Sequence, residues 1–211
     1  MSSRRPTFAR DAATAAYYDR RAEEYDEWYL GQGRFASLDR PSWHEEVARL
    51  QELVRGLPVA RTLDVACGTG FLTGHLRGVA VGVDLSPAMV ALARSRLPEG
   101  AAVVGDALRL PFGDGAFDRV LTCHFYGHLG PEEGVAFLNE ARRVARELVV
   151  VDSALRPGIE AEQWQERVLN DGSRHQVYKR YLSGADLGEE LGGEVIFEGR
   201  WFVGTRVTSV P

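Results

Sequence analysis

The chain has 211 residues, of which 45% are hydrophobic and 26% are charged, as in a soluble globular protein large enough for one domain with a sizeable core. The formal net charge of −5 argues against a nucleic-acid partner, because an acidic chain gains no counterion-release affinity for DNA or RNA. No run of about 18 apolar residues predicts a membrane span, and the N-terminus lacks the apolar stretch of a secretory signal, so a cytoplasmic location is expected.

The first predicted segment, 1–58, is a helical cap. Tyr18, Tyr25 and Tyr29 recur at spacings of seven and four residues, so they can share one face of a helix. Residues 44–57 are predicted to form an amphipathic helix, because the apolar residues Val47, Leu50, Leu53, Val54 and Leu57 fall on one side.

Strands and helices alternate over 59–153, the predicted cofactor-binding core. Helices are expected after the first strand as far as Leu76, at 87–97 and at 131–146. The strands are expected at 61–66, 79–84, 101–105, 117–123 and 147–153. This alternation predicts an α/β fold whose mostly parallel sheet is covered on both faces.

The C-terminal part is predicted in two pieces. Residues 154–183 are expected to be polar and irregular, partly helical, and to cover a substrate pocket. Residues 184–211 are expected to supply a helix at 184–191 and a closing antiparallel pair at 194–198 and 201–209. The whole chain is thus predicted to be a single Rossmann-like domain with a seven-stranded sheet and an antiparallel closing strand.

Three features follow the first three predicted strands in order. The turn CGTG joins the first strand to a helix, where glycines allow a ligand to approach the backbone and the helix offers free N–H groups. Asp84 ends the second strand and can accept both hydroxyls of a ribose. Asp106 follows the third strand and can accept from an adenine amino group. Singly, each has a plainer explanation, as a tight turn, a helix cap and a loop carboxylate; together they favour an adenosyl ligand.

These segments carry a family resemblance. LDVACGTGFLT, VGVDLSPAMVALAR and GDALRLPFGDGAFDRVLTCHFYGHL resemble motifs of the class I S-adenosylmethionine-dependent methyltransferases, and YYDRRAEEYD resembles the N-terminal segment of their ubiquinone/menaquinone-type branch. The resemblance implies S-adenosylmethionine as cofactor and S-adenosylhomocysteine as product. Two departures stand out: Ala66 replaces the usual first glycine, at little expected cost because a methyl group is small, and the Pro-Gly-Gly turn before the fifth strand is missing.

The resemblance also assigns cofactor contacts. Ala66, Gly68 and Gly70 would face the methionine moiety, and Asp84 would hold the ribose. Leu85 and Met89 would line the adenine, whose edge Asp106 and Ala107 would bind. Tyr18 or Tyr25 would cover the sulfonium, and His124 is expected beside the methyl group.

The acceptor site is expected near CHFYGHL and the later basic segment. His128 is the preferred general base or orienting group, although a packing role is equally open. Tyr29, Arg167 and Lys179, with Arg180 nearby, are expected to contact the acceptor, and the cations suit a carboxylate or phosphonate. A short likeness to phosphonate O-methyltransferases supports this; the alternative is a solvated strand face.

The predicted function is therefore methyl transfer to a small molecule, either an acidic oxygen nucleophile or a phenolic or quinone-like metabolite. No metal is expected, and the protein is expected to be a monomer or homodimer. A non-catalytic binder of the same cofactor remains an alternative. A nicotinamide-dependent oxidoreductase is disfavoured, because Thr73 stands where the third glycine of GxGxxG belongs.

Overall fold

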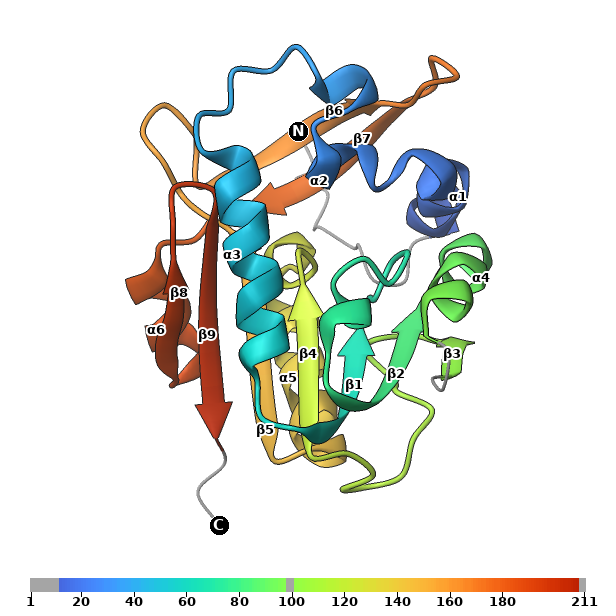
Figure 1. Cartoon of the computed structure of the whole chain (residues 1–211), viewed down its shortest axis with the longest axis vertical. Helices are drawn as coiled ribbons and strands as arrows, with labels where there is room; N and C mark the ends of the chain where they lie inside the picture. The colour runs from blue at the N-terminus through green and yellow to red at the C-terminus, as the bar shows by residue number, and fades with distance from the viewer. Residues whose placement is uncertain (1–11, 98–100, 209–211) are drawn as a thin grey trace.

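The computed structural model describes residues 12–97 and 101–208. The first eleven residues of the predicted helical cap and Ser209 of the predicted closing strand lie outside this part. A seven-stranded sheet has the order β3-β2-β1-β4-β5-β9-β8 (Figure 1). Its strands are β1 (Ala60–Val65), β2 (Gly78–Asp84), β3 (Ala101–Val104), β4 (Arg119–Cys123), β5 (Glu147–Ser153), β8 (Glu194–Glu198) and β9 (Phe202–Thr208).

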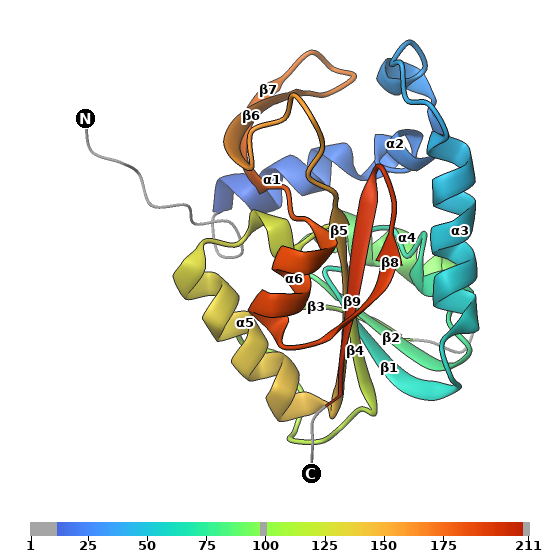
Figure 2. The ribbon, with the colours of Figure 1, turned by 90° about the vertical axis from the view of Figure 1, so that its left-hand side faces the viewer.

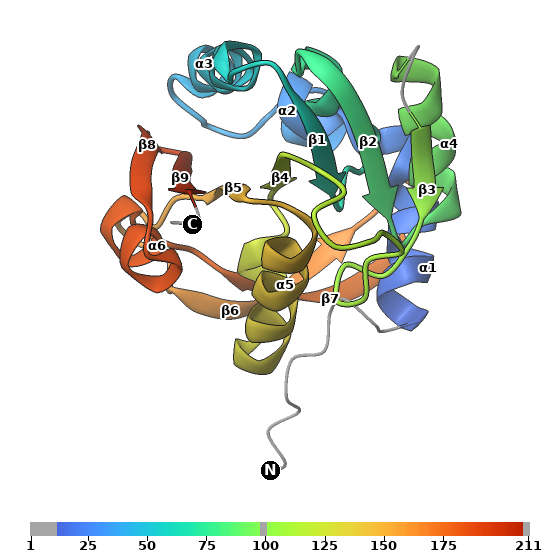
Figure 3. The same ribbon diagram turned by 90° about the horizontal axis from the view of Figure 1, so that it is seen from below.

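The predicted fold class is confirmed. Strands β1 to β5 pair in parallel, and β9 runs antiparallel to both β5 and β8. Helix α3 (Trp43–Gly56) covers one face of the sheet, and α5 (Pro131–Val144) and α6 (Gly184–Leu191) cover the other (Figure 3). Helix α4 (Pro87–Arg96) packs at the edge made by β2 and β3. No helix among the described residues is long and apolar enough to span a bilayer.

The strand order fixes where a ligand can bind. The chain order reverses between β1 and β4, and the carboxyl ends of parallel strands diverge at such a switch point and leave a crevice. Short one-turn helices follow two of these ends: η3 (Thr73–His75) after the CGTG turn, and η4 (Tyr126–His128) after β4. Apart from this crevice, the sheet packs into an apolar core that includes Leu63, Val120 and Val150, each fully buried.

The N-terminal segment is not one helix. It is divided into α1 (Ala12–Arg21), η1 (Ala22–Glu24), α2 (Glu27–Leu30) and η2 (Gly33–Phe35), which lie across the carboxyl ends of the strands (Figures 1 and 2). Gly31, in the left-handed region at φ +63°, ends α2. The three predicted tyrosines nevertheless form a row, with ring centroids 6.4 Å apart for Tyr18 and Tyr25 and 6.5 Å apart for Tyr25 and Tyr29.

The expectation of an irregular, partly helical segment at 154–183 is wrong. This segment contains an antiparallel hairpin of β6 (Glu162–Val168) and β7 (Arg174–Arg180), above the carboxyl ends of the strands. Trp164 faces Tyr178 across it, with ring centroids 5.7 Å apart. The turn contains Asp171-Gly172, with Gly172 at φ +84°, a pair that is typical of hairpin loops.

Candidate functional site

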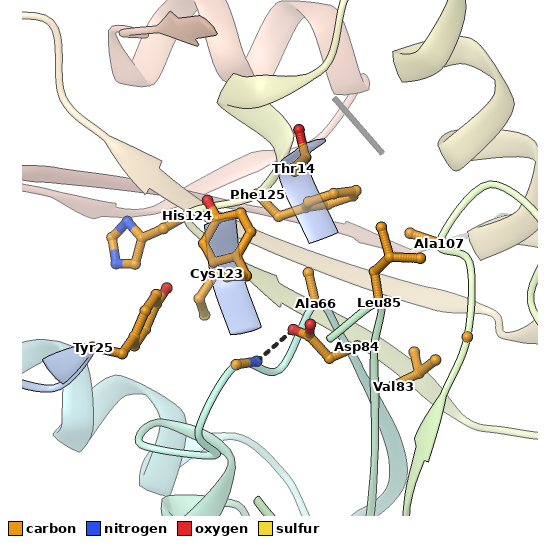
Figure 4. A pocket seen from close by; sticks show the side chains of 13 residues that line it. Thr14, Tyr25, Ala66, Val83, Asp84, Leu85, Ala107, Cys123, His124 and Phe125 are labelled. Carbon is orange, nitrogen blue, oxygen red and sulfur yellow. Dashed lines mark hydrogen bonds between the residues drawn. The ribbon is translucent and has the colours of Figure 1, made fainter. Parts of the chain in front are cut away.

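One cavity lies at the switch point. Its wall is built from α1, from Tyr25 directly after η1, from the turn after β1, and from the residues at the ends of β2, β3 and β4 (Figure 4). We call it the cofactor cavity; its lining residues are Thr14, Tyr18, Tyr25, Ala66, Gly68, Val83, Asp84, Leu85, Gly105, Ala107, Cys123, His124 and Phe125. Eight of the eleven predicted cofactor contacts are among them: Tyr18, Tyr25, Ala66, Gly68, Asp84, Leu85, Ala107 and His124.

The turn after β1 has a left-handed backbone at three positions. Ala66, Gly68 and Gly70 have φ of +57°, +55° and +78°. A side chain at Gly68 would meet the Tyr25 ring at 3.4 Å, so this glycine lets the tyrosine pack over the turn. Ala66 therefore costs more than its small methyl group suggests, because an L-residue in this conformation is destabilised by roughly 1–2 kcal/mol.

Asp84 is the charged group of the cofactor cavity. Its Oδ2 accepts the Gly68 N–H at 2.9 Å, the dashed bond in Figure 4, and its Oδ1 accepts the Ser86 N–H at 2.9 Å. Each carboxylate oxygen has a second lone pair, so the group can accept two more hydrogen bonds. Burial raises the pKa of Asp84 to about 6, although the N–H groups of Ser86 and Gly68 oppose that shift.

Three predicted cofactor contacts are absent from the cavity wall. Met89 is fully buried within α4, and Gly70 packs against Ala93, to whose Cα a β-carbon at Gly70 would lie 3.2 Å away. Asp106 accepts the Leu108 N–H at 2.8 Å and so shapes the loop that brings Ala107 to the wall. Met89 and Gly70 thus pack beneath the cavity wall, and a cofactor contact by Asp106 stays a prediction.

A second cavity, of about 160 Å³, adjoins the first and shares Tyr18, Tyr25 and His124 with it. We call it the acceptor cavity. Among the described residues, no aspartate or glutamate lines it and five cationic side chains do: Arg21, Arg40, Arg156, Arg167 and Lys179. Aromatic rings form most of the remaining wall: Trp28, Phe35, Trp43, Tyr181 and Trp201.

Sequence reasoning missed Arg21, Arg40 and Arg156 among these five cations. The guanidinium groups of Arg40 and Arg156 lie over indole rings, Arg40 at 3.9 Å from the Trp43 centroid and Arg156 at 4.5 Å from that of Trp201. Arg40 also donates to the carbonyl oxygens of Trp28 and Phe35. The only local signal for Arg156 was the Arg-Pro-Gly turn after the fifth strand, and its partner Trp201 is 45 residues further along the chain.

The predicted cations of the basic segment differ in their surroundings. Arg167 lines the acceptor cavity, and its guanidinium donates to Gln165 Oε1 at 2.5 Å. Lys179 also lines it, but is 2% exposed and forms an ion pair with the buried Asp152. The expectation that Arg180 lies near the acceptor is corrected: its guanidinium forms an ion pair with Glu190 at 2.5 Å, and it does not line the acceptor cavity.

The two remaining acceptor-site predictions, His128 and Tyr29, have different outcomes. His128 lines the acceptor cavity, and its Nδ1 lies 2.6 Å from the Tyr178 carbonyl oxygen, which accepts, so this nitrogen carries the proton. Burial lowers the pKa of His128 well below its ordinary value, which makes it a weak base. Tyr29 lines neither cavity: it stacks on Phe71 at 4.3 Å and is 3% exposed. The described residues hold no cluster of metal-ligating side chains.

Known proteins resemble this chain in sequence and in fold. The family described as Methyltransferase domain matches residues 63–149. A demethylmenaquinone methyltransferase of Beutenbergia cavernae is 42% identical over 47% of this chain and 43% of its own, and one of Mycolicibacterium gilvum is 33% identical over 80% of this chain and 66% of its own. The solved DhpI–SAH complex is 25% identical with a TM-score of 0.71, covering 94% of this chain and 97% of that one.

The matched part, residues 63–149, belongs to the methyltransferase-domain family, and the chain as a whole resembles S-adenosylmethionine-dependent methyltransferases in sequence and fold. The chain spans about half the length of the first curated relatives that it matches. Its cofactor cavity fits S-adenosylmethionine chemically. Asp84 has free lone pairs for a ribose diol, Gly68 lines the cavity with backbone alone beside the Tyr25 ring, and apolar side chains such as Val83 and Leu85 suit the adenine.

The raised pKa of Asp84 predicts that cofactor affinity depends on pH. Ribose hydroxyls donate to the ionised carboxylate, so binding should be constant above about pH 7 and weaken about tenfold per pH unit below about 6. Calorimetric titration with S-adenosylhomocysteine between pH 5 and 8 measures this.

Asp84→Asn should remove that dependence, because the amide does not titrate. The matched control is Asp64→Asn, since burial also raises the pKa of Asp64, to about 7, and Asp64 does not line the cofactor cavity. A slope that survives in Asp84→Asn and disappears in Asp64→Asn would assign the titration to Asp64 instead.

Proposed function

We propose that this methyltransferase transfers the methyl group of S-adenosylmethionine to an anionic oxygen, a carboxylate or phosphonate, of a small molecule. The observation that carries the proposal is the acceptor cavity, which adjoins the cofactor cavity and whose wall, in the part of the chain that the structure describes, has five cationic and no acidic side chains. Such a wall attracts an anion and repels cationic acceptors such as amines. At about 160 Å³ the cavity suits a small acceptor better than a protein or nucleic-acid chain.

Residues of the two cavities would have different roles, in binding the cofactor and in binding the acceptor. Asp84 would fix the ribose, and Tyr18 and Tyr25, which line both cavities, would exclude water from the region where they meet. Arg167 would bind an acceptor oxygen that does not react and so aim its neighbour. When bound, S-adenosylmethionine supplies a methyl group on a cationic sulfur: an oxygen lone pair forms the C–O bond while the C–S electrons pass to sulfur, giving S-adenosylhomocysteine.

Binding and alignment suffice for such an acceptor. A carboxylate is ionised near pH 7, so no proton has to be removed by the protein. Alignment of two reactants can supply roughly 7–11 kcal/mol of a barrier. The weak basicity of His128 is therefore consistent with this acceptor class, and we assign His128 an orienting role through its bond to the Tyr178 carbonyl.

A phenolic or quinone-like acceptor is the second candidate. The relatives from Beutenbergia cavernae and Mycolicibacterium gilvum are demethylmenaquinone methyltransferases, and Trp28, Trp43 and Trp201 give the acceptor cavity flat apolar surfaces. Such an acceptor requires removal of a proton, so its methylation should fall steeply at acid pH.

Product formation separates these candidates. The protein is incubated with S-adenosylmethionine and matched carboxylates, phosphonates, phenols and quinols, and S-adenosylhomocysteine and the methylated product are quantified by mass spectrometry. We expect turnover with carboxylates or phosphonates. Turnover confined to phenols or quinols would support the second candidate, and binding of S-adenosylhomocysteine without turnover of any acceptor would indicate a non-catalytic binder.

Arg167→Gln should raise KM for an anionic acceptor about ten- to hundredfold, with little change in S-adenosylmethionine affinity, because one hydrogen-bonded cation is removed. Arg174→Gln is the matched control on the same hairpin. Arg174 is exposed, pairs with Glu166 and lies outside both cavities, so its loss should leave KM unchanged. Equal effects of the two substitutions would contradict an acceptor contact by Arg167.

A further inference from the structure

His124 has an unusual position and backbone. It directly follows β4 and is one of three side chains that line both cavities. Its φ is +59°, in the left-handed region, while its backbone N–H donates to the Val151 carbonyl at 2.8 Å and so holds it there. A side chain other than glycine persists in such a conformation only where its surroundings enforce it, and such residues concentrate at functional sites.

The imidazole of His124 lacks the hydrogen bonds that its burial demands. It is 8% exposed, and neither Nδ1 nor Nε2 has a partner among the described residues. Its neighbours are aromatic, with ring centroids of Trp28, Phe202 and Tyr29 at 4.9, 5.2 and 5.6 Å. An unpaired buried polar group costs about 1–3 kcal/mol, so a ligand in the adjoining cavities is the partner that removes this cost.

Burial keeps the His124 ring neutral. It lowers the pKa of His124 to about 3, a shift that Asp152 opposes and to which Lys179 adds. These two charges form an ion pair with each other and nearly cancel. A neutral imidazole has one N–H donor, and at His124 no acceptor among residues 12–97 and 101–208 receives it. His128 differs, because the Tyr178 carbonyl accepts its Nδ1 proton.

We propose that His124 binds the methyl acceptor directly: its neutral imidazole donates an N–H hydrogen bond to an anionic oxygen of the acceptor where the two cavities meet. This inference rests on the proposed function and adds a specific acceptor contact to it. It also revises the sequence-based expectations, which placed His124 with the cofactor and gave the central acceptor role to His128.

A neutral donor suits this position chemically. A protonated imidazole would bind the oxygen more tightly, but it would reduce the electron density available for attack and repel a cationic sulfonium. A neutral N–H orients the oxygen with a weaker withdrawal of charge. Because no proton transfer is involved, the contact operates for a carboxylate or phosphonate that is already ionised.

The test uses the whole protein saturated with S-adenosylhomocysteine, and methylphosphonate as the probe. His124→Phe keeps a ring of similar shape among Trp28, Tyr29 and Phe202 but has no N–H. His124→Asn keeps an N–H donor and tolerates a positive φ. Affinity for methylphosphonate is measured by calorimetry, and the His124 ring resonances of 15N-histidine-labelled protein are followed by NMR. Thermal unfolding reports on folding of each variant.

We expect His124→Phe to weaken methylphosphonate binding about ten- to hundredfold while S-adenosylhomocysteine affinity changes less than threefold. His124→Asn should retain a measurable part of the affinity. In the unsubstituted protein the probe should shift the ring N–H resonance of His124 at pH 7.5, with the ring remaining neutral.

Other results would overturn the inference in distinguishable ways. Unchanged methylphosphonate affinity in His124→Phe would leave the proposed function standing and reject the His124 contact. Loss of S-adenosylhomocysteine affinity alone would indicate that His124 contacts the cofactor and not the acceptor. Failure of the unsubstituted complex to bind methylphosphonate, acetate or any other small anion would reject both the anionic acceptor and this inference. A variant that does not unfold cooperatively is replaced by His124→Leu in the same comparison.

Discussion

Asp84→Ala is expected to weaken S-adenosylhomocysteine binding about 10²- to 10⁴-fold. The carboxylate would accept two ribose hydroxyls, and each hydrogen bond to a charged group contributes about 1.5–3 kcal/mol. The substitution also removes the carboxylate oxygens that accept the Gly68 and Ser86 N–H groups, so the turn after β1 is no longer hydrogen-bonded to the end of β2 through this side chain. Calorimetric titration at pH 7.5, where the carboxylate is ionised, measures the loss.

Asp84→Asn separates these two contributions. The amide oxygen can still accept one backbone N–H, but the charge is gone, so we expect an affinity between those of the parent and the alanine variant. Thermal unfolding without ligand should change little in Asp84→Asn, because burial already disfavours the ionised carboxylate. Retention of S-adenosylhomocysteine affinity within threefold in Asp84→Ala would contradict the ribose role. NADH serves as the negative control ligand.

The parts of the fold that were predictable are those in which local pattern and tertiary structure agree. The apolar runs that became β1, β2, β4 and β5 are each bounded by a turn residue or a charge, and Ser86-Pro87 starts α4 with the serine accepting the Met89 N–H. Asp84 was identifiable because a strand end followed by a helix cap fixes its place at the edge of the sheet. Such features depend on neighbours within a few residues.

The parts that were not predictable depend on partners far along the chain. Lys179 looked like a free cation because its partner Asp152 lies 27 residues earlier, at the end of β5. The left-handed backbone of His124 is held by a bond to Val151 on the next strand, and no local pattern around CHFYGHL signals it. The hairpin at β6 and β7 carried a local signal, Asp171-Gly172, which its polar composition obscured.

Lys179→Met is expected to destabilise the protein by about 3–5 kcal/mol, the usual cost of breaking a buried ion pair on one side. Asp152 is fully buried, and its Oδ2 accepts the Gly127 N–H at 2.7 Å. Burial alone would raise the pKa of Asp152, but the Lys179 ammonium opposes this, and the pKa stays at about 2. Without Lys179 a buried carboxylate remains with no cation. Chemical denaturation at pH 7.5 gives the free energy of unfolding.

The double variant Asp152→Asn/Lys179→Met tests whether the pair serves stability or the acceptor. It leaves neither charge uncompensated, so at least half of the lost free energy of unfolding should return, and the coupling energy follows from the four proteins. Because Asp152 already neutralises Lys179, removal of both charges should change KM for an anionic acceptor less than threefold, in contrast to Arg167→Gln. A large rise in KM in a stably folded double variant would show instead that the Lys179 ammonium binds the acceptor despite its buried partner. Lys179 on β7 would then bind the acceptor together with Arg167 on β6.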